Sequence, residues 1–101
     1  MGNKLKEKMK VIYKITYPNG KIYIGSDLTN NINYFGSANN KIISEDFTKK
    51  QRKNFTIKRQ ILWESKTATK SKVIKKEMEL IIYHKSNNPE IGYNRSPKFR
   101  K

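Results

Sequence analysis

Two acidic residues in the second half of the chain, Glu77 and Glu79, have different surroundings if the segment KSKVIKKEMELIIYHK forms a helix. At about 100° per residue, Glu77 falls in the middle of an apolar stripe, whereas Glu79 falls among lysines. A carboxylate on a buried face is costly unless it is paired with a cation or binds a metal. Glu77 is therefore either the ion-pair partner of a lysine or of Arg59, or a ligand for a hard divalent cation such as Mg²⁺.

Two tyrosines, Tyr13 and Tyr23, flank the turn sequence Pro18-Asn19-Gly20. This order of residues is typical of a three-residue hairpin loop in which the glycine takes the left-handed conformation. With that loop Tyr13 faces Gly25, and both phenols share one face of the sheet. A two-residue loop would shift the register by one and separate them. Because aromatic residues favour strands in any case, simple packing remains an alternative reading of both tyrosines.

Three elements must position these side chains. Alternating apolar residues predict a hairpin over 9–25, and a further strand is predicted over 54–63. Arg59 would share a face of that strand with four apolar residues: Phe55, Ile57, Ile61 and Trp63. The helix that carries Glu77 is predicted over 67–85.

The rest of the chain completes a single domain over residues 9–96, between basic tails at 1–8 and 97–101. Residues 26–40 are rich in Asn, Ser and Gly and are predicted to be mostly loop, with a short helix over 39–47. The turn-rich segment 86–94 is expected to pack back on the sheet.

Charge is the strongest global signal. Lys and Arg number 23 against 8 Asp and Glu, which gives a net charge of +15. Such a field attracts polyanions, and nucleic acid is the usual partner because each neutralised phosphate releases a counterion. With no cysteine, neither a disulfide nor a thiolate zinc site can form. The sequence shows no secretory signal and no apolar run that could span a membrane, so a cytoplasmic location beside DNA is expected.

The hairpin also carries a family signature. Val11-Ile12-Tyr13, followed ten residues later by Tyr23-Ile24-Gly25, resembles the two half-motifs that name the GIY-YIG nucleases, with Val11 where the family usually has glycine. The resemblance covers roughly residues 9–96. Its further motifs follow in family order: Pro18-Asn19-Gly20-Lys21, Asn54-Phe55, Glu77 and Gly92-Tyr93-Asn94.

This resemblance implies an α+β (α/β) fold, a small central antiparallel three-stranded sheet flanked by helices. It also implies a metal-dependent DNA endonuclease that hydrolyses phosphodiester bonds. Tyr13 would help to deprotonate the attacking water, Tyr23 would position water or phosphate, and Glu77 would ligate a single Mg²⁺ or Mn²⁺. Three further residues are implied in supporting roles: Asn94 bracing the site, Lys21 contacting phosphate or a tyrosine oxygen, and Gly25 leaving room for backbone near the DNA.

One departure from the family pattern stands at Asn33, where an arginine is usual. The segment Asn33-Tyr34-Phe35-Gly36-Ser37 resembles a branch with a Tyr-x-Gly-Ser loop, in which that arginine is less regular. Another cation must then meet the DNA phosphate, or the protein is weakly active or inactive. The candidates are Lys41, Arg52 and Arg59, and Arg59 is preferred for its place on the inward face of a strand.

Three functions stay open from the sequence. The first is the endonuclease. The second is a catalytically weak or inactive basic nucleic-acid-binding module that keeps the fold. The third is a basic structural protein. Sequence specificity cannot be read from the chain, so a homodimer or a separate specificity partner also stays open.

Overall fold

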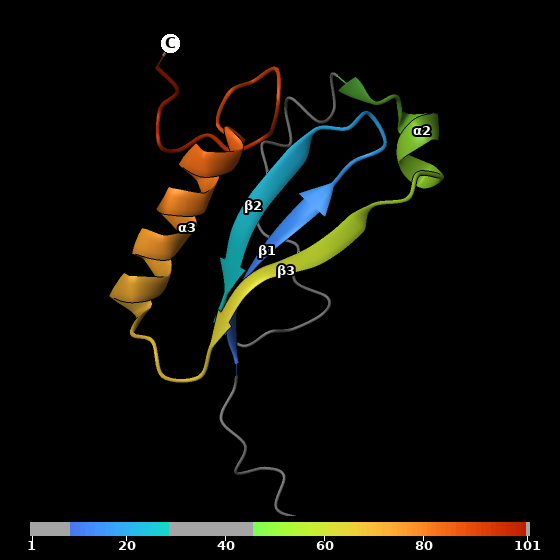
Figure 1. The fold of residues 1–101 in the computed structure, drawn as a ribbon. Coiled ribbons are helices and arrows are strands. Elements are labelled where there is room, and N and C mark those ends of the chain that lie inside the picture. The colour runs from blue at the N-terminus through green and yellow to red at the C-terminus, as the bar shows by residue number, and fades with distance from the viewer. Residues whose placement is uncertain (1–8, 29–45, 101) are drawn as a thin grey trace, which may run out of the picture.

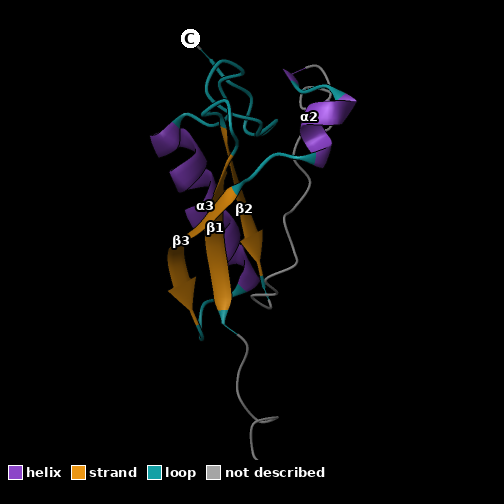
Figure 2. Cartoon of the chain, turned by 90° about the vertical axis from the view of Figure 1, so that its right-hand side faces the viewer, coloured by secondary structure: helices purple, strands orange, loops and turns teal. Residues whose placement is uncertain are grey.

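The computed structural model describes residues 9–28 and 46–100, in which a three-stranded antiparallel sheet carries one long helix on one face (Figures 1 and 2). The strand order is β2-β1-β3, so β1 is central and β2 lies at an edge. Along the chain the elements are β1 (Lys10–Thr16), β2 (Ile22–Asp27), α2 (Lys49–Lys53), β3 (Lys58–Ser65) and α3 (Lys70–His84). The expected α+β class with a three-stranded antiparallel sheet is confirmed.

The hairpin has the predicted loop and register. Tyr17 N donates to Lys21 O at 2.9 Å and Gly20 N donates to Tyr17 O at 2.9 Å, which closes the three-residue loop. Gly20 has a φ of 87°, the left-handed conformation that such a loop requires. Tyr13 therefore faces Gly25 across the two strands, as expected.

The third strand begins and ends later than predicted. Thr48 caps α2 and forms a reciprocal capping box with Gln51, so residues 49–53 become helical and the strand cannot start at 54. A bulge then interrupts the pairing with β1, because Ile12 faces Trp63 while Tyr13 faces Ile61. The extra residue turns Trp63 to the other face of the sheet. The prediction that Trp63 shares a face with Arg59 is therefore wrong.

Each face of the sheet has its own apolar cluster. The face under α3 buries Ile12, Ile24, Ala68, Val73 and Ile81, with Leu62, Trp63 and Leu80 packed against them. The opposite face buries Val11, Tyr13, Ile15, Tyr23, Phe47 and Tyr93. Because strand side chains alternate between faces, both tyrosines of the half-motifs lie on the face away from α3.

Helix α3 occupies most of its predicted range. The Thr69 hydroxyl accepts from Lys72 N at the N-terminus, and Lys85 ends the helix in a left-handed conformation. After α3 the chain turns back, as predicted, and pairs with the outer edge of β2, where Ile22 N donates to Ile91 O and Tyr93 N donates to Ile22 O. Residues 39–45 of the expected short helix lie outside the described part. In the ranges that are described, no helix has the length and apolar character needed to cross a bilayer.

Candidate active site

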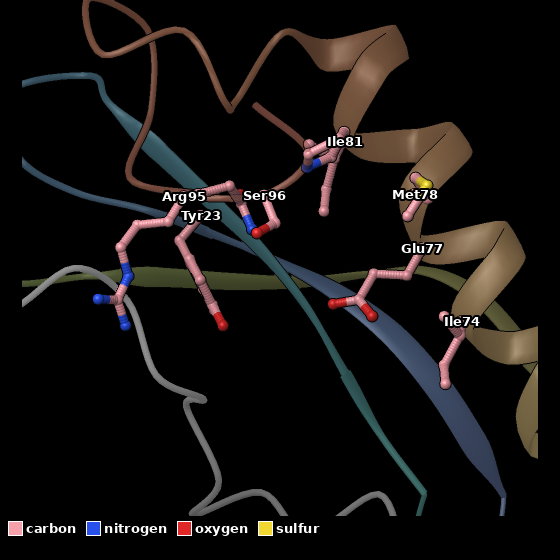
Figure 3. Close-up of a pocket in the computed structure, with 9 residues that line it drawn as sticks. Tyr23, Ile74, Glu77, Met78, Ile81, Arg95 and Ser96 are labelled. Carbon is pink, nitrogen blue, oxygen red and sulfur yellow. The ribbon is translucent and has the colours of Figure 1, made fainter. Parts of the chain in front are cut away.

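The two faces of the sheet meet at the edge of β2, and an open pocket of about 310 Å³ lies there. Tyr23 reaches it from one face and Glu77 from α3 on the other face. In Figure 3 the Tyr23 hydroxyl and the Glu77 carboxylate point toward the same space. The remaining lining residues are Ile74, Met78, Ile81, Asn94, Arg95, Ser96 and Pro97.

Glu77 has the orientation that the helical phase predicts. Its carboxylate is half-buried, and its Oε1 accepts a hydrogen bond from Ser26 Oγ at 3.2 Å. Burial raises the pKa of Glu77, and the hydrogen bond from Ser26 only partly opposes that effect. Glu79, two positions on, points into solvent and pairs loosely with Lys76 at 3.8 Å.

An ion pair between Glu77 and Arg59 is not formed, so that alternative reading of Glu77 is wrong. Arg59 lies on the opposite face of the sheet, where its guanidinium carbon is 4.9 Å from the centre of the Tyr13 ring. Within residues 9–28 and 46–100, the ion pairs found are Lys21–Asp46 and Lys76–Glu79. Glu77 takes part in neither pair.

Arg59 is held in an unusual setting for a cation. Its Nε and Nη2 atoms are buried and have no hydrogen-bond partner in the described part of the chain. A buried donor without a partner costs free energy, and a charged one costs more. The stacking on Tyr13 offsets part of that cost. This cation therefore keeps unused donors next to one of the two half-motif tyrosines.

The two phenols lie together over Gly25. Tyr13 is fully buried and Tyr23 is 9% exposed, and their ring centroids are 6.4 Å apart. A Cβ atom on Gly25 would come 2.5 Å from Tyr13 Oη and 3.0 Å from Tyr23 Cε2. The space that the glycine leaves is thus filled by the phenols themselves. The resemblance had implied that this room serves backbone near the DNA.

Asn94 braces β2, as the resemblance implies. Its Oδ1 accepts from Ile24 N at 2.8 Å, and its Nδ2 donates to Ile24 O at 2.8 Å. The side chain thus satisfies both main-chain groups of Ile24 on the free edge of the strand. Tyr23 and Gly25, on either side of Ile24, are held in place by this contact.

Lys21 is engaged at the hairpin turn. Its Nζ lies 3.0 Å from Asp46 Oδ2, and the Tyr93 hydroxyl donates to the same oxygen at 2.7 Å. The hydrogen bonds from Tyr93 and Lys21 hold the pKa of Asp46 below its ordinary value, while burial is the largest of the effects that raise the pKa of Tyr93 to about 12. Among the described residues, the ion-pair partner of Lys21 is therefore the carboxylate of Asp46, whereas the resemblance implied contact with a phosphate or a tyrosine oxygen.

Several site residues had little or no sequence signal. Ser26 could have been inferred, because strand alternation places it with Ile24 on the α3 face. No pattern in the local sequence predicts that Asp46 pairs with Lys21, or that Arg95 lines the same pocket as Glu77. Of the other cation candidates, Arg52 belongs to α2 and Lys41 lies outside the described residues, as does Asn33, where the family usually has arginine.

Glu77, which lines the pocket, and Ser26, which contacts its carboxylate, carry oxygen atoms that suit a hard divalent cation. Glu77 offers a carboxylate and Ser26 a hydroxyl, and Mg²⁺ prefers such oxygens together with water. Burial disfavours the bare anion of Glu77, a cost that a bound cation would relieve. Among the described residues, no group of three or more His, Asp or Glu side chains is placed to hold a metal. Glu77 would be the charged ligand, as the resemblance implies.

Comparison with known proteins finds no matching family model, no matching curated protein and no matching solved structure.

Proposed function

We propose that this chain is a metal-dependent DNA endonuclease of the GIY-YIG kind, which hydrolyses phosphodiester bonds. One observation carries the proposal. Tyr23 and Glu77, from distant segments and opposite faces of the sheet, reach the same pocket around the edge of β2. Tyr13 lies beside Tyr23, with 6.4 Å between the ring centroids.

The resemblance implies the roles of the residues. Glu77 would hold Mg²⁺ or Mn²⁺ with Ser26 beside it, and the bound cation would supply a Lewis acid for phosphate oxygen. Tyr13, in its phenolate form, would accept the proton of the attacking water, and Tyr23, which lines the pocket, would orient water or phosphate. Asn94 keeps the strand that carries Tyr23 in register with the pocket.

Arg59 serves as the cation that the chain lacks at Asn33. Its guanidinium lies over the Tyr13 ring and keeps Nε and Nη2 free of other hydrogen bonds. Preorganised positive charge stabilises a phosphoryl transition state because no reorganisation is needed during the reaction. Both nitrogens are buried, so this role requires a local opening that exposes them to the phosphate.

Supercoiled plasmid incubated with Mg²⁺ or Mn²⁺ tests the proposal. We expect nicking by the wild type and loss of nicking in Glu77→Gln, down to the level of the metal-free protein. Glu79→Gln is the matched control, because it makes the same chemical change two positions away on the exposed face of α3. Wild-type protein that binds DNA but never nicks it with either metal would refute the proposal.

A second pair of variants distinguishes a catalytic role of the Tyr13 hydroxyl from the packing of its ring. Tyr13→Phe keeps the ring and its packing but removes the hydroxyl, so we expect nicking to fall by about 10²–10⁴-fold. Tyr83→Phe, at a position that is 78% exposed, should leave nicking unchanged.

The inactive nucleic-acid-binding module is the second candidate function. It is favoured by Asn33, which stands where the family usually has an arginine. It predicts DNA binding that is sensitive to salt but no cleavage, and no change in binding when Glu77 becomes Gln. Cleavage that disappears in Glu77→Gln would exclude this candidate.

A further inference from the structure

A second pocket, of about 230 Å³, lies on the side of α3 away from Glu77. It is lined by Trp63, Lys72, Lys75, Lys76 and Glu79. On the helix Lys72 and Lys76 point roughly opposite to Ile74 and Met78, which line the first pocket. The second pocket therefore belongs to the β3 side of the molecule and is distinct from the proposed active site.

The three lysines are unfavourable for the helix that carries them. Lys72 lies in the first turn of α3, which contains no acidic residue, and a cation at that place opposes the helix macrodipole. Lys72 is also spaced from Lys75 and Lys76 at i,i+3 and i,i+4, where like charges repel. In the described part of the chain, Lys76–Glu79 at 3.8 Å is the only ion pair they make. An external anion would remove this cost.

Trp63 adds an aromatic surface to the positive charge. The bulge in β3 turns its side chain to the α3 face, where it packs against the buried cluster and remains partly exposed. The indole is therefore held in place before any ligand arrives. Single-stranded nucleic acids bind proteins through such a combination, with bases stacked on aromatic rings and phosphates near lysines.

We propose that this pocket binds an unpaired nucleotide, with the base against the Trp63 indole and the neighbouring phosphates at Lys72, Lys75 and Lys76. An acidic peptide would satisfy the lysines but would leave the indole face without a stacking partner. A base within a duplex is already stacked on its neighbours and cannot reach the ring. The pocket thus favours single-stranded over double-stranded segments, whether or not the chain cuts DNA.

Trp63 is the only tryptophan of the chain, so its fluorescence reports on this pocket alone. Full-length protein is titrated with an oligothymidylate and with a duplex of equal length at several salt concentrations. We expect saturable quenching by the single strand and weaker quenching by the duplex. Changing Lys72, Lys75 and Lys76 to Gln should weaken binding and reduce the slope of log K against log salt by about 2, since each phosphate contact contributes about 0.7 on single strands.

The matched control changes Lys49, Lys50 and Lys53 to Gln. These lysines are exposed on α2, which precedes the N-terminal end of β3, whereas Trp63 lies near its C-terminal end (Figure 1). The substitutions therefore remove the same charge away from the pocket. The control should keep the quenching of Trp63. Equal quenching in both triple variants, equal quenching by the duplex, or the same response to polyglutamate would overturn the proposal. Because the readout needs no cleavage, the quenching is expected even if the nuclease proposal fails.

Discussion

At the scale of single residues, position on an element decides the chemistry of a side chain. Glu77 and Glu79 are identical in type and two positions apart, yet Glu77 is half-buried and burial raises its pKa, while Glu79 lies in solvent. Arg59 shows the same principle for a cation, because its buried donors have no hydrogen-bond partner. Such costs without structural compensation are typical of functional sites.

Arg59→Met tests whether this cost serves catalysis. Replacing a poorly compensated buried charge by an apolar side chain of similar length should raise the free energy of unfolding by about 1 kcal/mol. If Arg59 meets the phosphate, nicking should fall by about a hundredfold in the same variant. Urea denaturation and the plasmid assay measure the two effects. A variant that is less stable and fully active would contradict both expectations.

At the scale of elements, the segment after α3 acts as an additional edge for β2. Ile91 and Tyr93 exchange main-chain hydrogen bonds with Ile22, and the Asn94 side chain continues the pairing at Ile24. The segment thereby keeps Tyr23 close to the pocket from which Glu77 projects.

Asn94→Ala removes both hydrogen bonds to Ile24. At about 1 kcal/mol for each bond, we expect the free energy of unfolding to fall by about 2 kcal/mol. Nicking should also fall below the wild-type rate under conditions where the variant is fully folded, because Tyr23 loses its support. Asn88→Ala removes only a local turn contact to Glu90 N and serves as the control. Equal stability of the two variants would argue against the bracing role.

The hairpin turn is joined to the C-terminal segment through Asp46, and this junction should be sensitive to pH. Since the pKa of Asp46 is held below its ordinary value of 3.8, its stabilisation is complete above that value and is lost as the pH falls through the folded-state pKa. Wild type should exceed Asp46→Asn by about 1 kcal/mol in free energy of unfolding at pH 7. Urea denaturation should show the difference shrinking well below pH 3.8. A difference that grows on acidification would contradict the assignment.

At the scale of the whole molecule, the net charge of +15 favours a general electrostatic attraction to nucleic acid, which does not depend on the base sequence. The charge is carried by lysines on many surfaces, including α2 and the outer side of α3. Affinity for DNA should therefore depend mainly on the number of phosphates that are neutralised.

Gel shifts across a series of salt concentrations test this expectation. With about 6–10 phosphate contacts, affinity should fall by about 10³–10⁵-fold between about 50 and 200 mM salt. The slope of log affinity against log salt should be the same for Glu77→Gln as for the wild type. The proposed role of Glu77 is in catalysis, not in the electrostatic attraction of DNA. No binding even at low salt would support a basic structural protein instead.

Local sequence determined the parts of this protein that depend on neighbouring residues. Pro18, Asn19 and Gly20 specify the hairpin loop, and the loop length alone places Tyr13 and Tyr23 on one face. The apolar period of the helix likewise separates Glu77 from Glu79. Turn conformation and periodicity act over a few residues, so they can be read without a structure.

Only the tertiary structure decided how these parts meet. The capping box of Thr48 delayed the start of β3, and the bulge in β3 moved Trp63 to the α3 face; neither follows from the alternation of residues 54–63. The tyrosines and Glu77 lie on opposite faces, and the open edge of β2 is what brings Tyr23 and Glu77 to one pocket. Such contacts depend on packing between segments far apart in the chain, which no local pattern specifies.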